Sequence, residues 1–167
     1  MKKQMTKLKV VSRLVILLAV LGFYSSAQAQ ISVGLKVNAS QNGMEATTRG
    51  SCQKQPNPNG CIHVSRSTQI NFSLPNAKCS DNERWKLGQI TLGNSNKGQA
   101  GNISQAAVDD FNANASTGVV TPVTSSANHI LIRDNNSQQY DIWYTVSASC
   151  GGNTIYTDPR IENGGRE

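Results

Sequence analysis

Apolar and polar residues alternate along several segments of this chain, which is the pattern of half-buried β-strands. The alternation is clearest at these positions: Ile31, Val33, Leu35 and Val37; Ile70, Phe72 and Leu74; Ile130 and Ile132; Tyr140, Ile142, Tyr144 and Val146. Another strand over residues 85–92 changes phase between Leu87 and Ile90, which predicts a β-bulge at Gly88. Residues 119–123 contain Pro122 and indicate a short or edge strand.

Turn signals separate these strands, and only one segment has a helical pattern. The stretch "SQAAVDDFNAN" predicts a short helix with Ser104 as its N-cap. Residues 130–132 and 140–146 flank "DNNSQQ" and are expected to form a hairpin with a long loop. Roughly seven strands of this kind predict an all-β fold, an antiparallel β-sandwich of immunoglobulin-like type, with a closed barrel as the alternative.

The first 29 residues have the organisation of a secretory signal peptide. Five basic residues precede an apolar run over residues 14–23, and Ala27-Gln28-Ala29 follows it as a cleavage site. Because a transmembrane helix needs about 20 apolar residues, this shorter run predicts no retained transmembrane segment. We expect export by the Sec route to the periplasm or the extracellular space.

Removal of that segment changes the charge of the chain. Of the 16 lysines and arginines, 11 remain in residues 30–167 beside 10 acidic residues, so the mature chain is nearly neutral. Its basic residues are scattered singly, whereas nucleic-acid binding needs a clustered basic face, and no nucleic-acid partner is predicted. The length fits a single β-sandwich domain over residues 30–167.

All four cysteines lie in the mature part, where an oxidising compartment favours disulfides. Four cysteines allow three pairings. We favour Cys52–Cys61 because the intervening "QKQPNPNG" contains turn-forming residues, and Cys79–Cys150 follows as the second bridge. There is no C-x-x-C, and His63 is the only histidine near a cysteine, so no metal site is predicted.

Residues for catalysis are sparse. His63 and His129 are the only histidines, and neither has a local nucleophile signature such as G-x-S-x-G. Asp109 and Asp110 are adjacent and would point about 100° apart on a helix. The segment "DNNSQQYD" has oxygen ligands but lacks the spacing of a calcium loop, so a turn is favoured. No catalytic residue and no cofactor are predicted.

Aromatic residues on the last long strand provide the best candidate for a binding site. Trp143 has the phase opposite to Tyr140, Ile142 and Tyr144, so it points outwards if Ile142 faces the core. An outward tryptophan is a typical contact for a glycan or a protein, whereas the alternative is that a loop covers it. We therefore predict Trp143, Tyr140 and Tyr144 as ligand-binding residues.

The C-terminal quarter has a strand "YDIWYTVSA", a glycine turn and then "YTDPRIENGG". This order resembles the ending of small bacterial proteins of the DP-EP family, in which a strand closes on Asp-Pro. The matching residues are Asp158-Pro159, Ile161 and Asn163, although the chain has no Glu-Pro dipeptide. The resemblance implies a small β fold and no particular reaction, and Asp158-Pro159 is expected to end the strand.

These observations favour an exported, disulfide-stabilised binding or structural module whose partner is a glycan or a protein. Two alternatives belong to other classes. One is a secreted hydrolase that uses His63 or His129. The other is a secreted inhibitor that inserts the loop between Cys52 and Cys61 into its target.

Overall fold

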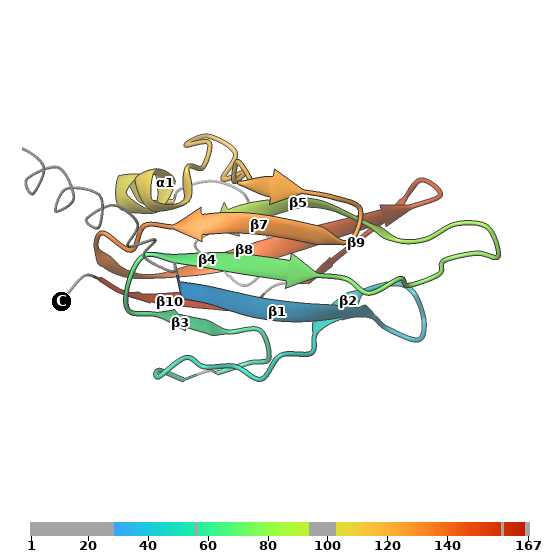
Figure 1. The fold of residues 1–167 in the computed structure, drawn as a ribbon, viewed down its shortest axis with the longest axis horizontal. Coiled ribbons are helices and arrows are strands. Elements are labelled where there is room, and N and C mark those ends of the chain that lie inside the picture. The colour runs from blue at the N-terminus through green and yellow to red at the C-terminus, as the bar shows by residue number, and fades with distance from the viewer. Residues whose placement is uncertain (1–28, 56, 94–102, 158, 166–167) are drawn as a thin grey trace, which may run out of the picture.

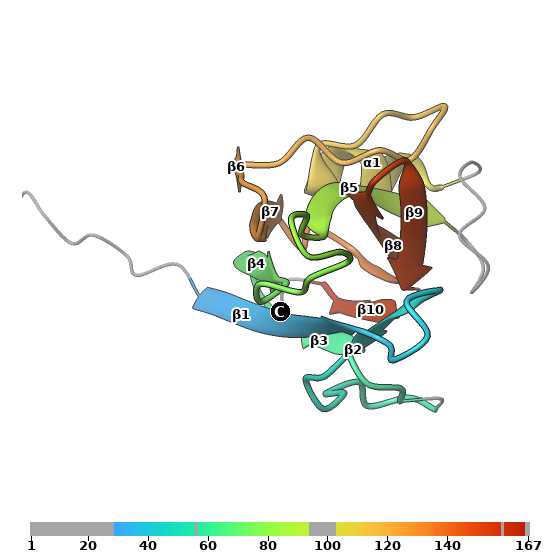
Figure 2. The same ribbon diagram turned by 90° about the vertical axis from the view of Figure 1, so that its right-hand side faces the viewer.

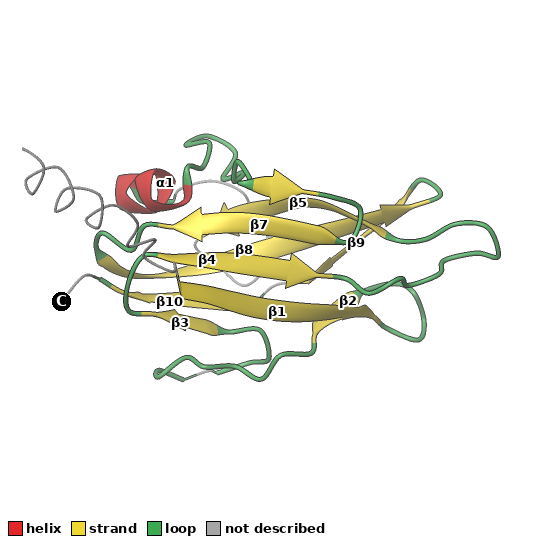
Figure 3. Cartoon of the chain, in the orientation of Figure 1, coloured by secondary structure: helices red, strands yellow, loops and turns green. Residues whose placement is uncertain are grey.

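The computed structural model describes residues 29–55, 57–93, 103–157 and 159–165, which form β-strands and one short helix (Figures 1 and 3). The elements are β1 (Ala29–Val37), β2 (Met44–Ala46), β3 (Ile62–Val64), β4 (Thr68–Ser73), β5 (Lys86–Gly93), α1 (Gln105–Phe111), β6 (Thr124–Ser125), β7 (His129–Asp134), β8 (Gln139–Cys150), β9 (Asn153–Thr157) and β10 (Arg160–Gly164). The all-β prediction is confirmed. The predicted helix is also present, and the Ser104 hydroxyl accepts the amide of Ala107 as its N-cap.

The strands form two sheets that pack face to face, as the end-on view in Figure 2 shows. The first sheet has the order β2-β1-β4-β7-β6, and the second has the order β3-β10-β8-β5 with β9 beside β8. The sheets are mainly antiparallel, as predicted, but β1 pairs with β4 in parallel and β10 pairs with β3 in parallel, and the immunoglobulin-like type stays a prediction. In both parallel pairs, the two strands are far apart in the sequence.

The expected hairpin between residues 130–132 and 140–146 is wrong. β7 belongs to the first sheet and β8 to the second, so residues 135–138 cross from one sheet to the other at one end of the sandwich. Alternation predicts a strand and its buried face, but it contains no information about which sheet the next strand joins. The crossing brings the end of β7 next to α1.

The segment after the glycine turn runs back along the whole length of β8. β9 pairs with residues 146–150 and β10 pairs with residues 139–143, both antiparallel and in the same register. Pro159 lies between them, and its carbonyl accepts the amide of Tyr144 at 3.0 Å. Asp158-Pro159 was expected to end this strand, but the ladder continues beyond it to Gly164. Asp158 itself lies outside the described residues.

Apolar side chains from both sheets form the core between them. Phe72 from the first sheet and Tyr144 from the second pack edge to face, with ring centroids 5.2 Å apart. The register between β5 and β8 shifts between Leu87 and Ile90, which confirms the predicted bulge. Both predicted disulfides are confirmed, with Cα–Cα distances of 5.6 Å for Cys52–Cys61 and 6.5 Å for Cys79–Cys150.

The predicted signal peptide falls outside the described residues, apart from Ala29, which begins β1. Cleavage after Ala29 would leave Gln30 at the N-terminus, inside the pairing of β1 with β4. No helix in the described ranges is long and apolar enough to cross a membrane.

Candidate functional site

Polar side chains from three neighbouring strands lie side by side on the outer face of the second sheet. Ile62, Ile142 and Ile161 are register partners and point into the core, so their chain neighbours point outwards. The same registers place Glu162 beside His63 on β3 and beside Asp141 on β8. A carboxylate at the middle of this row is therefore flanked by an imidazole and by a second carboxylate.

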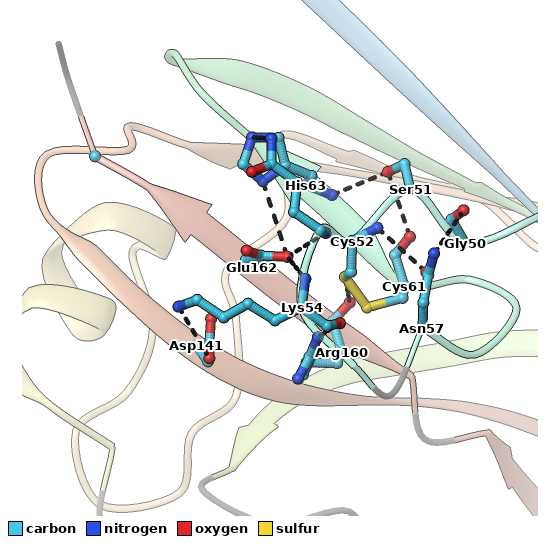
Figure 4. Close-up of polar contacts among 12 residues, drawn as sticks. Gly50, Ser51, Cys52, Lys54, Asn57, Cys61, His63, Asp141, Arg160 and Glu162 are labelled. Carbon is cyan, nitrogen blue, oxygen red and sulfur yellow. Dashed lines mark hydrogen bonds and ion pairs between the residues drawn. A yellow bond between two sulfur atoms is a disulfide. The ribbon is translucent and has the colours of Figure 1, made fainter.

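A loop of residues 50–61, which we call the disulfide loop, lies over this face (Figures 2 and 4). The Cys52–Cys61 bridge closes it, and the Asn57 side chain accepts the amide of Cys52. The sheet holds it from below, since the guanidinium of Arg160 donates to the carbonyl of Lys54 at 2.6 Å. Lys54 also forms an ion pair with Asp141 at 3.6 Å. The loop is thus fixed at both its base and its middle.

Glu162 is the central anchor of the disulfide loop. One oxygen, Oε2, accepts the backbone amides of Gln53 at 2.6 Å and Lys54 at 3.2 Å, and the residue is only 4% exposed. Burial disfavours the charged carboxylate, but the two amides and the charges of His63 and Lys54 outweigh it. The pKa of Glu162 is therefore lowered, and the carboxylate is ionised at neutral pH.

A pocket of about 290 Å³ lies between the disulfide loop and the ends of β3 and β10. The residues that line it are polar side chains and two glycines: Gln53, Lys54, His63, Ser65, Gln139, Glu162, Asn163, Gly164 and Gly165. The side chains supply amide donors and acceptors, one ammonium, one imidazole and one carboxylate. Such a set suits a ligand with many hydroxyl groups, because each hydroxyl both donates and accepts.

Trp143 lies on the same outer face as this pocket. It is half-buried, and its register partners are Arg160 on β10 and Gly93 on β5. Arg160 is itself buried under Lys54 of the disulfide loop. Trp143 therefore stands at the edge of the loop on the side away from Gln139, and its role as a ligand contact stays a prediction.

The two tyrosines predicted beside Trp143 point the other way. Tyr144 is only 1% exposed, and its hydroxyl donates to the carbonyl of Gly60 at 2.7 Å, which contradicts its predicted ligand role. Tyr140 is half-buried, and its hydroxyl donates inwards to Asp110 at 2.9 Å. Both share the core phase of Ile142, because residues two apart on a strand face the same side. Of these three aromatic residues, only Trp143 therefore points to the outer face.

The polar groups around His63 do not assemble a nucleophile. Its ring lies 3.2 Å from the side-chain nitrogen of Gln53 and 4.0 Å from Glu162. Ser51 is close, but its hydroxyl accepts the backbone amide of His63. Within the described ranges, no serine hydroxyl contacts either histidine ring, so the arrangement of a Ser-His pair is not formed there. His129 lies far from this face, on β7 of the other sheet.

Part of the backbone of the disulfide loop is used inside the protein, which bears on the alternative of an inhibitor that inserts this loop into its target. Here the amides of Gln53 and Lys54 donate to Glu162, and the carbonyl of Lys54 accepts Arg160. The loop backbone therefore faces its own sheet at these two residues.

A second polar cluster, which we call the end cluster, fills the end of the sandwich beneath α1. Its members come from different elements and are all buried or half-buried: Asp110 of α1, Asp134 of β7, Asn136 of the crossing segment, Tyr140 of β8 and Asn163 of β10. These elements meet at one end of the molecule in Figure 1. The oxygen ligands of the segment "DNNSQQYD", for which the sequence favours a turn over a calcium loop, are divided here, because Asp134 points into this cluster while Asp141 pairs with Lys54 outside.

Hydrogen bonds connect the members of the end cluster. The amide of Asn163 donates to Asp134 at 3.2 Å and to Asp110 at 3.5 Å, and so bridges the two carboxyl groups. Asn136 donates its backbone amide to Asp134 at 2.8 Å. Burial and the charge of Asp110 raise the pKa of Asp134 to about 7, although its hydrogen bonds partly oppose the rise. Burial, with the charge of Asp134, also raises the pKa of Tyr140 well above its ordinary value, so its hydroxyl remains a donor.

The cysteines do not form a metal site within the described part of the chain. Cys79, Cys150 and Glu83 lie close enough to share an ion. Both sulfurs, however, belong to one disulfide, and a disulfide sulfur is not the thiolate that metal ions bind.

The sequence predicted Trp143 and named His63, but it did not indicate Glu162, Arg160 or the end cluster. Their burial depends on a loop from another part of the chain and on the crossing between sheets. One signal was available for Glu162 and Arg160. Both are charged and alternate with the apolar residue Ile161 in a closing strand.

Removing the Cys52–Cys61 bridge tests whether it fixes the loop. For the double variant Cys52→Ser/Cys61→Ser we expect a loss of roughly 2–3 kcal/mol in the free energy of unfolding, because the bridge closes a short loop. Chemical denaturation at neutral pH measures it. Limited proteolysis should cut the disulfide loop of the variant first, and an unchanged cleavage pattern would contradict a bracing role.

Comparison with protein-family models and with curated proteins gives no match. The resemblance to the DP-EP family therefore stays a prediction. The assignment of function therefore depends on the geometry of the outer face and its pocket.

Proposed function

We propose that this protein is an exported binding module that holds a neutral glycan on the outer face of the second sheet. The observation that carries the proposal is the fixed disulfide loop, which leaves a polar pocket of about 290 Å³ beside it and Trp143 on the same face. Glycan sites combine an aromatic surface for the sugar ring with polar groups for its hydroxyls.

The fixed position of the polar groups supports binding. Glu162 is held by two amides and the backbone of Lys54 is held by Arg160, so this side of the pocket is fixed before a ligand arrives. Export is supported by the signal-peptide pattern and by the two disulfides, which persist in oxidising compartments.

A glycan array, followed by calorimetry on the best glycan, tests this proposal with Trp143→Ala. We expect the variant to bind at least about tenfold more weakly, because an aromatic side chain that packs on a ligand commonly contributes more than about 1 kcal/mol. Tyr156→Ala is the matched control, because Tyr156 is 56% exposed on β9 and is paired with Ser147, which is farther along β8 from the pocket residue Gln139 than Trp143 is. Equal losses in both variants, or no glycan bound by the wild type, would overturn the proposal.

A further inference from the structure

The pocket and the end cluster share one stretch of backbone. Asn163, Gly164 and Gly165 line the pocket on its inner side. The side chain of Asn163 lies in the end cluster, and the Asn136 side chain forms two bonds with the backbone of Gly165, at 3.1 and 3.0 Å. We call these three residues the pocket wall. Its position depends on groups that never face the ligand.

Asp134 controls the charge of the end cluster. The groups that face it are Asp110 from α1, Tyr140 from β8, Asn163 from β10 and Asn136 from its own connection. Thr68 is its register partner on β4 and is neutral. None of these groups is a cation, so the described part of the chain gives Asp134 no positive partner.

One oxygen of Asp134 already has its hydrogen bonds and the other has none. Oδ1 accepts the amides of Asn136 and Asn163, whereas Oδ2 is buried and has no partner among the described residues. The residue is 0% exposed. A buried carboxylate oxygen without a donor is costly, and a proton on Oδ2 removes that charge.

We propose that proton binding at Asp134 loosens the pocket wall and thereby lowers the affinity of the pocket for its ligand, the second step resting on the proposed glycan-binding function. When Asp134 is ionised, its Oδ1 accepts charge-assisted hydrogen bonds from the amides of Asn136 and Asn163. These bonds hold Asn163 directly and Gly165 through the side chain of Asn136. A proton on Asp134 removes the charge and weakens both bonds, so the wall is held less firmly.

We expect this response in the physiological range of pH. The pKa of Asp134 is raised to about 7, so the group changes its charge between mildly acidic and mildly alkaline solution. Transfer between such conditions would then change the order of the pocket wall without any change in the disulfides.

Backbone NMR titration between pH 5 and pH 9 tests the first step without any ligand. In the wild type, we expect the amide resonances of Asn163 and Gly165 to shift with a midpoint near 7, together with the carboxyl carbon of Asp134. Asp134→Asn should remove the shifts, and Asp109→Asn should keep them, because Asp109 is exposed and bonded to Gln105. His63 lies beside Gly164, so the titration is repeated in His63→Gln, where the shifts of Gly165 should persist.

The outcomes separate this inference from the proposed function. Flat titrations in the wild type would overturn it, and the carboxyl carbon gives that result even if Asp134→Asn fails to fold. A response to added Ca²⁺ at constant pH, lost in Asp134→Asn, would also overturn it, because the cluster would then take a metal ion instead of a proton. Once a glycan ligand is identified, its affinity should be about fivefold or more higher at pH 8 than at pH 6. Titrating amides without any bound glycan would support the wall device and contradict only the glycan function.

Discussion

Relative to the wild type, the variant Asp134→Asn is expected to gain about 4 kcal/mol in the free energy of unfolding as the pH rises from 4 to 8. The physical reason is the buried position of Asp134, which raises its pKa from 3.8 to about 7. An asparagine is neutral at every pH and does not have to be ionised in the folded state.

The direction of the change follows from proton binding. Between pH 3.8 and about 7 the unfolded chain releases the proton of Asp134 while the folded chain retains it. The folded state therefore binds more protons, and stability falls as the pH rises through this window. Below 3.8 both states are protonated and the contribution of the group is complete, while above about 7 it is lost.

Urea denaturation of both proteins at several pH values measures this difference directly, since contributions from other carboxyl groups cancel between variant and wild type. Asp109→Asn is the matched control, because Asp109 is adjacent in the helix but exposed. Because that side chain is exposed, the control should lack the gain of about 4 kcal/mol expected from burial. A constant difference for Asp134→Asn would mean that the buried carboxyl keeps its ordinary titration.

Local patterns predicted those parts of the fold that depend on neighbours in the chain. The alternation of Ile70, Phe72 and Leu74 places all three in the core, and the phase change around Gly88 is a bulge. The turn residues between Cys52 and Cys61 indicated which cysteine pairs with which. In each case the relevant spacing is a few residues, where the geometry of one strand or one loop decides the outcome.

The arrangement of the sheets was not predictable in the same way. The parallel pairing of β1 with β4 and the crossing from β7 to β8 join segments through long-range contacts. An alternating strand has the same pattern in either sheet and in either direction. Proline was also misleading at residue 159, because its fixed backbone fits at a position where only the carbonyl is used in the ladder.

The candidate site shows the same limit on a smaller scale. Phase correctly placed Trp143 on the outer face, but it could not show that Glu162 and Arg160, on that face too, are covered by the disulfide loop. Tyr140 and Tyr144, although aromatic, share the phase of the core residue Ile142, and their hydroxyls donate inwards. Strand phase therefore decides the direction of these side chains more strongly than their chemical type does.

Replacing Glu162 by alanine should destabilise the protein by roughly 3–5 kcal/mol at neutral pH, because two hydrogen bonds to a charged acceptor are lost. The amides of Gln53 and Lys54 would be left without their acceptor beneath the disulfide loop. We expect the loop to detach, the pocket to lose one side and glycan binding to disappear. Chemical denaturation measures the stability, and hydrogen exchange at Gln53 and Lys54 measures the detachment.

Glu162→Gln separates the hydrogen bonds from the charge. Both amides donate to a single oxygen, so a glutamine retains an acceptor for them, and a loss of only about 1–2 kcal/mol is expected. Because the pKa of Glu162 is lowered in the folded state, its charge stabilises the fold above pH 4.5, and this contribution is lost as the pH falls. The gap between wild type and Glu162→Gln should therefore narrow in acid. Glu45→Gln is the control, because Glu45 pairs with Lys36 on an exposed surface and such pairs contribute about 0–1 kcal/mol. If Glu162→Ala were no more destabilising than Glu45→Gln, Glu162 would not anchor the disulfide loop, and the pocket would lack the fixed side on which glycan binding depends.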